Sequence, residues 1–308
     1  MGKYILKRLM QSVIVIFGVT ICAFGLLYLT GDPTLLVLGD SASKMSAEEI
    51  AAFRVARGFD RPWIIQYGEY MWNVLHGDLG TSYYYLRPNI EVIGEAFPKT
   101  AQLAVSAVLM TMIIAIPLGI LSATHKNTWI DRFSMGFGLL GQSLPVFFLG
   151  LFLILIFAVK LRWFPVSGYG SLKNFVLPTI ALGLFSCAQN ARMVRSCMLE
   201  VMGQDYMRTA ESKGISKFKV IFKHGLRNAL MPIVTMFSME FAELLGGAVI
   251  TENIFAWPGI GQLCVRAINT KDIPLVQSCI IVISLIFIVI NLLTDILYVF
   301  LDPKARLK

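Results

Sequence analysis

The stretch DYMRTAESKG, residues 205–214, decides the fold, because it is a short polar helix set between blocks of apolar sequence. Asp205 is a suitable N-cap, and Gly214 suits the position just after the last helical turn. The spacing therefore predicts a helix of about two turns, followed by a second helix over 217–227. A short helix held between two membrane spans is well shaped to enter the groove of a partner protein. The alternative is a solvated basic loop.

Long apolar blocks lie on both sides of this stretch. Apolar residues make up 56% of the chain and charged residues only 15%, against about 25% in a typical soluble domain. A helix needs about 20 apolar residues to cross a bilayer, and six blocks reach this length. They are residues 9–29, 100–123, 133–159, 175–194, 230–250 and 276–300, the third with a kink expected at Pro145. We expect an all-α integral membrane protein with six transmembrane helices.

The distribution of charge predicts how these helices are oriented. With six spans, both termini lie on one side, and the segments on that side carry many more basic than acidic residues. The basic residues are Lys3, Lys7, Arg8, Lys126, Arg132, Arg192, Arg195, Arg208, Lys213, Lys217, Lys219, Lys223, Arg227, Lys304, Arg306 and Lys308. Loops rich in Lys and Arg stay in the cytoplasm, so we expect both termini there. In a bacterial host this is the cytoplasmic side of the inner membrane. This topology accounts for the net charge of +8 without a nucleic acid as partner.

The first outer segment, residues 31–98, is long for a connection and carries helix signals of its own. Ser46 and Glu49 form a capping-box pattern, and a second helix is expected over 60–75. The aromatic residues of this second helix favour an amphipathic helix at the outer membrane interface. A docking surface for an outside partner is the alternative.

The last outer segment holds the sequence FAWPGIG, residues 255–261. The Pro-Gly pair predicts a turn, and Phe255 and Trp257 suit the membrane interface. Irregular backbone at membrane depth must line a cavity or be buried in protein, so a re-entrant or pore-lining element is expected here.

Several classes of function are excluded by missing motifs. The sequence has no GxxxxGK[ST] phosphate loop, no HExxH and no GxSxG. Its five cysteines are odd in number and form no CxxC pair, which indicates neither a disulfide framework nor a zinc site. We therefore expect no enzyme activity, no metal site and no cofactor in this chain.

Three carboxylates lie inside the predicted spans, namely Glu240, Glu243 and Asp295. A charge in hydrocarbon costs about 3 kcal/mol or more unless it faces a cavity or a partner. Glu240 and Glu243 share one helix face, with Met239 beside them. These four residues are candidates for the translocation path of a cationic or metal-bearing solute. A polar contact with a partner subunit is the alternative.

Residues 205–214 resemble the EAA loop of ABC importer permeases. Arg208-Thr209-Ala210, three residues and then Gly214 is the form usual in the peptide, opine and nickel branch, with Arg and Thr in place of the Glu and first Ala of the general motif. Other short motifs of that branch follow in order over nearly the whole chain. They are Gly31-Asp32-Pro33, Gly77-Asp78-Leu79-Gly80, Arg227-Asn228-Ala229-Leu230, Gly246-Gly247, Trp257-Pro258-Gly259 and Asp302-Pro303-Lys304.

This resemblance implies a type I, MetI-like permease fold and ATP-driven import of dipeptides, oligopeptides, nickel or a nickel chelate. It implies a second homologous permease, two cytoplasmic ATPase subunits that bind ATP and Mg, and an extracytoplasmic substrate-binding protein as partners, besides membrane lipid. The residues implied in coupling to the ATPases are Tyr206, Arg208, Thr209, Ala210, Glu211, Lys213 and Gly214. A secondary transporter or channel without ATPase partners is the alternative.

The expected organisation has four parts. Residues 1–30 form the N-terminal segment and first span, and residues 31–98 form the extracytoplasmic segment. Residues 99–303 form the permease core, including a cytoplasmic coupling loop at 195–228. Residues 304–308 form a cytoplasmic tail.

Overall fold

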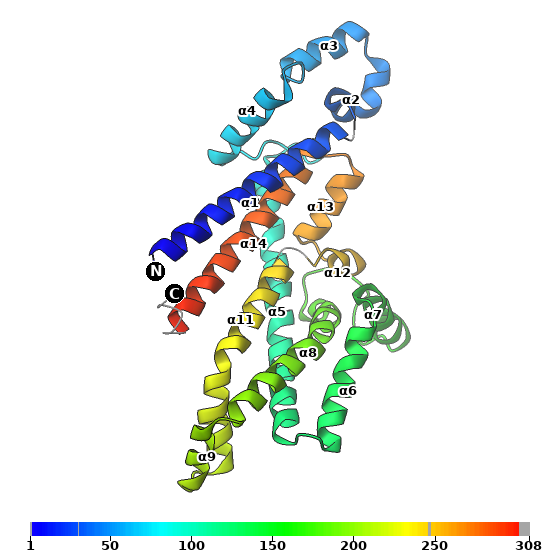
Figure 1. The fold of residues 1–308 in the computed structure, drawn as a ribbon. Helices are drawn as coiled ribbons and strands as arrows, with labels where there is room; N and C mark the ends of the chain where they lie inside the picture. Colours follow the sequence, from blue (N-terminus) through cyan, green and yellow to red (C-terminus); the bar gives the residue numbers. More distant parts are fainter. Residues whose placement is uncertain (1, 30, 246–247, 302–308) are drawn as a thin grey trace. The chain divides into compact units, whose positions relative to one another are not determined.

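The fold is built from helices, as Figure 1 shows. The computed structural model describes residues 2–29, 31–245 and 248–301. Among these residues the only β-type pairing is an isolated bridge between Thr81 and Pro88. The all-α class is confirmed, while the motifs at 246–247 and 302–304 and the predicted tail at 304–308 lie outside the described residues.

The chain forms two compact units, each described here by itself. Unit 1 comprises Met1–Lys99 and Pro258–Ile288, and unit 2 comprises Thr100–Trp257 and Val289–Lys308. The long helices α5 (Asn89–Thr124) and α14 (Ile273–Leu301) contribute to both units.

Unit 1 joins the N-terminal helices to a helical hairpin from the end of the chain. Its other helices are α1 (Gly2–Leu29), α2 (Pro33–Leu38), the 3-10 helix η1 (Gly39–Lys44), α3 (Ala47–Ala56), α4 (Trp63–Leu75) and α13 (Ile260–Asn269). Its core packs Ile93 against Ile260, Leu275 and Cys279, all buried.

The helix starts of the outer segment follow the sequence signals. The capping box is formed, because Glu49 N donates to Ser46 Oγ (3.2 Å) and Ser46 N donates to Glu49 Oε2 (2.7 Å). The helix expected over 60–75 is α4, which begins after Pro62. Both predictions are confirmed.

Unit 2 packs the rest of α5 with α6 to α12. These helices are α6 (Trp129–Ser143), α7 (Val146–Leu153) with its π-helical continuation η2 (Ile154–Lys160), α8 (Leu172–Met202), α9 (Asp205–Ser212), α10 (Lys217–Lys219) with its π-helical continuation η3 (Val220–Leu226), α11 (Arg227–Leu245) and α12 (Val249–Ile254). The main core holds Ala115, Val194, Met198, Ile233 and Phe237, from α5, α8 and α11.

Close contact between α5 and α8 depends on a glycine. A Cβ placed on Gly119 would lie 2.6 Å from Val194 and 2.8 Å from the carbonyl oxygen of Ala191. Such distances are far shorter than real packing allows, so any side chain at position 119 would push α5 and α8 apart.

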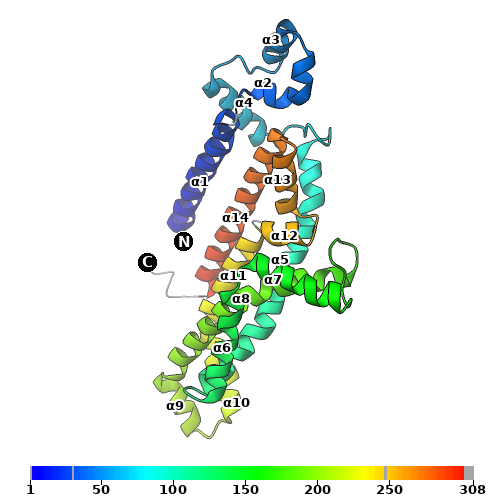
Figure 2. The ribbon, with the colours of Figure 1, turned by 90° about the vertical axis from the view of Figure 1, so that its right-hand side faces the viewer.

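The third predicted span is broken rather than kinked. Leu144 has extended backbone (φ −100°, ψ 131°), and α7 starts after Pro145. Proline disfavours helical backbone at the residue before it, so the helix stops at Ser143 and restarts in a new direction. Figure 2 shows α7 turning away from α6, and the expectation of one kinked helix over 133–159 is wrong.

The turn after α12 is buried in protein. Phe255 and Trp257 are 2% and 0% exposed, and Ala256 takes a left-handed conformation (φ 47°). Trp257 N donates to the carbonyl oxygen of Glu252 (2.8 Å). Burial in protein agrees with the expectation for irregular backbone at membrane depth. The position of both aromatic residues at the membrane interface stays a prediction.

Two helices among the described residues are long and apolar enough to cross a membrane, Asn89–Thr124 and Ile273–Ile296. Two shorter apolar helices cover Met10–Gly25 and Val146–Lys160. The first pair corresponds to the spans predicted at 100–123 and 276–300. The count of six spans stays a prediction.

Candidate coupling site and translocation path

Helix α9 is fixed to unit 2 by one apolar face. Met207 and Ala210 are buried and pack with Val220 of η3, together with Val201, Met202 and Ile215. Positions 207 and 210 are three apart, so they share one side of the helix. The predicted two-turn helix is confirmed, and it is a docked helix instead of a solvated loop.

The two ends of α9 differ in how well the sequence predicted them. Its N-cap is Gln204, with no capping bond from the side chain, so Asp205 is the first helical residue and the expectation of Asp205 as N-cap is wrong. Asp205 still faces the positive end of the helix dipole there. At the other end, Gly214 adopts φ +77° and donates its N–H to Glu211 O (2.9 Å), as expected for a C-terminal glycine.

The opposite face of α9 is open. Tyr206 is 43% exposed, and Arg208, Thr209, Glu211 and Lys213 are exposed as well. Six of the seven residues implied in coupling are therefore accessible. Ala210 is the exception, because its side chain is part of the packed face.

Two further aromatic residues are exposed in the segment that follows α9. Phe218 is 69% exposed and Phe222 41%, with ring centroids 4.5 Å apart. Sequence reasoning treated 217–227 only as a basic helix. Exposed phenylalanines one helical turn apart in a polar segment could have revealed the surface.

The segment after α9 joins it to the spans. Gly225 in η3 is buried, and a Cβ there would lie 3.3 Å from the Met198 methyl group and 3.4 Å from that of Met207. Helices α8, α9 and η3 therefore pack tightly around one small residue. Packing contacts thus link α9 to η3, and η3 in turn contacts α8 and α11.

A partly buried ion pair between Asp131 and Arg195 ties the first turn of α6 to α8. Arg195 donates from Nε to Asp131 Oδ1 and from Nη2 to Oδ2, both at 2.8 Å. Ser122 Oγ and Asn127 N also donate to this carboxylate. These four bonds hold the pKa of Asp131 far below its usual value, Arg195 first among them. Sequence reasoning missed the pair, because its partners are 64 residues apart.

The candidate path residues meet in a groove between α8 and α11. It has a volume of about 430 Å³ and is lined by Ser186, Gln189, Asn190, Met193, Pro232, Thr235, Met236, Met239, Glu240 and Glu243. Asn190 Nδ2 donates to Glu240 Oε2, while the buried Oε1 has no hydrogen-bond partner among the described residues. Glu243 and Met239 are exposed. The structure thus brings three of the four path candidates together.

Asp295 is placed differently. It is partly buried in α14 and does not line this groove. Its assignment to the path stays a prediction.

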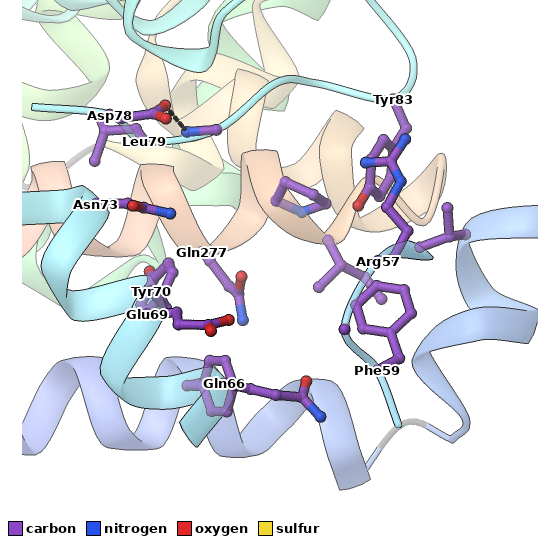
Figure 3. Close-up of a pocket in the computed structure, with 16 residues that line it drawn as sticks. Arg57, Phe59, Gln66, Glu69, Tyr70, Asn73, Asp78, Leu79, Tyr83 and Gln277 are labelled. Carbon is purple, nitrogen blue, oxygen red and sulfur yellow. Dashed lines mark hydrogen bonds between the residues drawn. The ribbon is translucent and has the colours of Figure 1, made fainter. Parts of the chain in front are cut away.

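A second cavity, of about 270 Å³, lies in unit 1 and is drawn in Figure 3. Gln66, Glu69, Tyr70 and Asn73 line it from α4, and Gln277 lines it from α14. Among the described residues, no group of three or more His, Cys, Asp or Glu side chains could hold a metal ion.

Comparison with known proteins covers almost the whole chain. Residues 115–307 match the family described as binding-protein-dependent transport system inner membrane component, and residues 1–110 match the N-terminal domain of such membrane components. A putative peptide transport system permease protein of Brucella abortus (strain 2308) is 42% identical over 99% of each chain. A glutathione transport system permease protein of Shigella flexneri serotype 5b is 39% identical over the full length of both chains.

A solved structure shares the fold. An inward-facing form of the MetNI methionine ABC transporter has a chain that aligns with a TM-score of 0.59 at 16% identity, over 69% of this chain and 97% of that one. The MetI-like permease fold expected from the sequence is confirmed. The chain belongs to the family of binding-protein-dependent transport system inner membrane components, the permease subunits of ABC importers.

Proposed function

We propose that this chain forms half of the translocation pathway of an ABC importer for small peptides, together with a second homologous permease. Two cytoplasmic ATPase subunits bind ATP and Mg and act on this chain through α9, and an extracytoplasmic binding protein delivers the peptide. The chain lies in the bacterial inner membrane with both termini in the cytoplasm. Family membership favours this function over the secondary transporter or channel.

The observation that carries the proposal is the division of α9 into a held face and an open face. Met207 and Ala210 hold the helix against η3, and Tyr206, Arg208 and Glu211 are left accessible. A docking helix needs both properties. A helix without a packed face could move together with its partner while the spans stayed in place. Gly214 ends the helix in a left-handed turn, which sets the direction in which the chain leaves.

The substrate class rests on the relatives and on the groove. Two relatives of full length carry names that refer to peptide and glutathione transport. The groove adds carboxylates at Glu240 and Glu243, which suit a solute with an ammonium group, and flexible Met239, which adapts to varied side chains. Nickel import, with Asp295 as a further path residue, stays a prediction that no comparison tests.

Isolation of the intact complex tests the proposal. The tagged chain is purified from native membranes in a mild detergent, and its partners are identified by mass spectrometry. We expect a second permease and two ATPases with phosphate-loop motifs. A chain recovered alone, or only with copies of itself, contradicts the proposal.

Uptake then tests the substrate. A strain that lacks this chain is compared with the complemented strain for uptake of labelled dipeptides, glutathione and Ni²⁺. We expect the chain to restore peptide uptake. Restoration of Ni²⁺ uptake alone contradicts the peptide assignment while leaving the role as a permease intact.

A further inference from the structure

Helix α4 presents a continuous apolar stripe. Ile64, Gly68, Trp72 and Leu75 follow one another at intervals of four, four and three residues, so they lie on one side of the helix. The three large side chains are 64%, 64% and 75% exposed, and Ile65 beside them is 49% exposed. An exposed apolar surface of this size on one helix indicates a site of contact with another protein or with lipid.

The polar residues of α4 lie on another side of the helix and line the unit 1 cavity. In Figure 3, Gln66, Glu69 and Asn73 extend from α4 towards the unit 1 cavity. Within unit 1, the stripe therefore faces away from the polar cavity, and the helix is amphipathic with its apolar side outward.

Contacts with α1 join α4 to the first predicted span. The hydroxyl groups of Tyr67 and Thr20 share a buried hydrogen bond of 2.9 Å, and the rings of Phe17 and Tyr67 meet edge to face at 5.8 Å. Thr20 lies nine residues before Leu29, the end of α1, which corresponds to about 14 Å along the helix. With Leu29 at the outer boundary of the predicted span, this distance matches half of the hydrocarbon core, which is about 15 Å thick.

The exposed surface of α1 has the same character at the same level. Ile14, Phe17 and Ile21 are 69%, 50% and 41% exposed and lie on one side of α1. The stripe thus belongs to a helix that packs on α1, the first predicted span, which itself exposes apolar side chains. Trp72, whose ring centroid lies 4.3 Å from that of His76 with the two planes tilted by 42°, has the amphipathic ring that favours the level of the headgroups.

We propose that α4 is inserted in the outer leaflet of the membrane, with the stripe Ile64, Ile65, Gly68, Trp72 and Leu75 in contact with lipid. Helix α3 stays in water. The inference rests on the orientation given in the proposed function, in which residues 31–98 lie outside. It assigns lipid, rather than an extracytoplasmic protein, as the partner of this face.

Nitroxide spin labels on the stripe distinguish contact with lipid, with water and with protein. Single cysteines are introduced by Ile64→Cys or Leu75→Cys on the stripe and by Glu48→Cys on the exposed first turn of α3, in the full chain with its five native cysteines replaced by alanine. Each variant that retains peptide uptake is labelled and reconstituted in phospholipid vesicles. Collisions with oxygen, which concentrates in lipid, are compared with collisions with a neutral Ni²⁺ chelate, which stays in water.

We expect oxygen collisions to exceed those with the Ni²⁺ chelate several-fold at both stripe positions, and the reverse at position 48. A dominant Ni²⁺ signal at 64 and 75 would mean that the stripe faces water, as a docking surface for an outside protein does, and would overturn the proposal. Low collision rates with both reagents would mean a cover of protein and would overturn it too.

A separate measurement checks the orientation. A membrane-impermeant maleimide added to spheroplasts should label the Glu48→Cys variant. Failure of this labelling refutes the orientation in the proposed function, whereas successful labelling with a water-exposed stripe refutes only the insertion of α4.

Discussion

Gly214 is the residue whose replacement tests the coupling role most directly. Its φ of +77° costs about 1–2 kcal/mol for a side chain with a Cβ, and no neighbouring atom lies within 4 Å to add a clash. We expect Gly214→Val to lower peptide uptake at least about tenfold while the amount of protein in the membrane stays unchanged. Asn tolerates this conformation better, so Gly214→Asn should retain most of the uptake. Equal uptake by the Val and Asn variants would refute the requirement for a left-handed residue.

The ion pair between Asp131 and Arg195 predicts an effect on the stability of unit 2. Asp131→Asn leaves Arg195 without its charged partner, which costs about 3–5 kcal/mol in a fully buried pair. Because Arg195 is still 26% exposed, we expect about 1–3 kcal/mol. Thermal unfolding of the purified parent and variant measures the difference, and Glu200→Gln, at an exposed residue of α8, is the control.

The same pair predicts a pH dependence with a definite sign. Folding lowers the pKa of Asp131, so its contribution is complete above the unfolded pKa of about 3.9 and is lost as the pH falls through the lower folded value. The stability difference between parent and Asp131→Asn should therefore stay constant from about pH 8 to 5 and shrink only below about pH 4. A difference that disappears near pH 6 would show that another group is responsible.

Glu240 tests whether the groove recognises positive charge. Gln can still offer an oxygen to Asn190, so Glu240→Gln removes the charge and leaves the shape nearly unchanged. We expect uptake of a dipeptide to fall about tenfold, equivalent to about 1.4 kcal/mol, while an N-acetylated dipeptide is affected less. Met239→Leu, a change of similar volume in the same groove, is the control. Equal losses for both substrates would contradict a contact with the peptide ammonium group.

For single residues, the sequence predicts features that depend on the local backbone conformation. It misses features that depend on contacts between residues far apart in the chain. Gly214 could be predicted because a left-handed helix end favours glycine wherever it occurs. Asp205 is the expected N-cap because Asp is a preferred capping residue and Gln is not, but the helix starts one residue earlier than this preference predicts. The partnership of Asp131 with Arg195 appears only when α6 and α8 are packed together.

Among the elements, α9 should separate docking from folding. Tyr206→Ala and Arg208→Ala alter the exposed face, so we expect them to weaken capture of the ATPases at least about fivefold without changing thermal stability. Met207→Ala removes a buried side chain and should lower stability by about 2–4 kcal/mol. Co-purification with the ATPases and thermal unfolding are measured for all three variants. Normal capture by both exposed-face variants would refute α9 as the docking element.

Helix boundaries, too, can be predicted from the sequence where they depend on neighbouring residues, and not where they depend on the fold. The capping box at Ser46 predicts the start of α3, because all its partners lie within one turn. The break at Pro145 and the π-helical segments η2 and η3 are not visible in apolar periodicity, since a π-helix adds one residue per turn without changing composition. Burial of Phe255 and Trp257 could not be predicted either, because an aromatic residue beside a Pro-Gly turn suits a membrane interface equally well.

For the whole molecule, the break at Pro145 makes the third apolar block the critical one for the topology. If α6 and α7 together cross the bilayer once, six spans place both termini in the cytoplasm. If they enter and return on the same side, every later loop changes sides and the C-terminus lies outside. Alkaline phosphatase, which needs disulfides and folds only outside the cytoplasm, separates these cases when fused after different residues.

The fusion sites are Ser43, Lys126, Val166, Gly203 and Lys308. We expect high phosphatase activity after Ser43 and Val166 and low activity after Lys126, Gly203 and Lys308. A fluorescent protein that matures only in the cytoplasm should give the opposite pattern, which controls for differences in expression. Low activity after Val166 combined with high activity after Lys308 would refute the six-span count and move the C-terminus outside. Since α9 directly follows Gly203, the same result would place α9 outside and refute its docking on cytoplasmic ATPases.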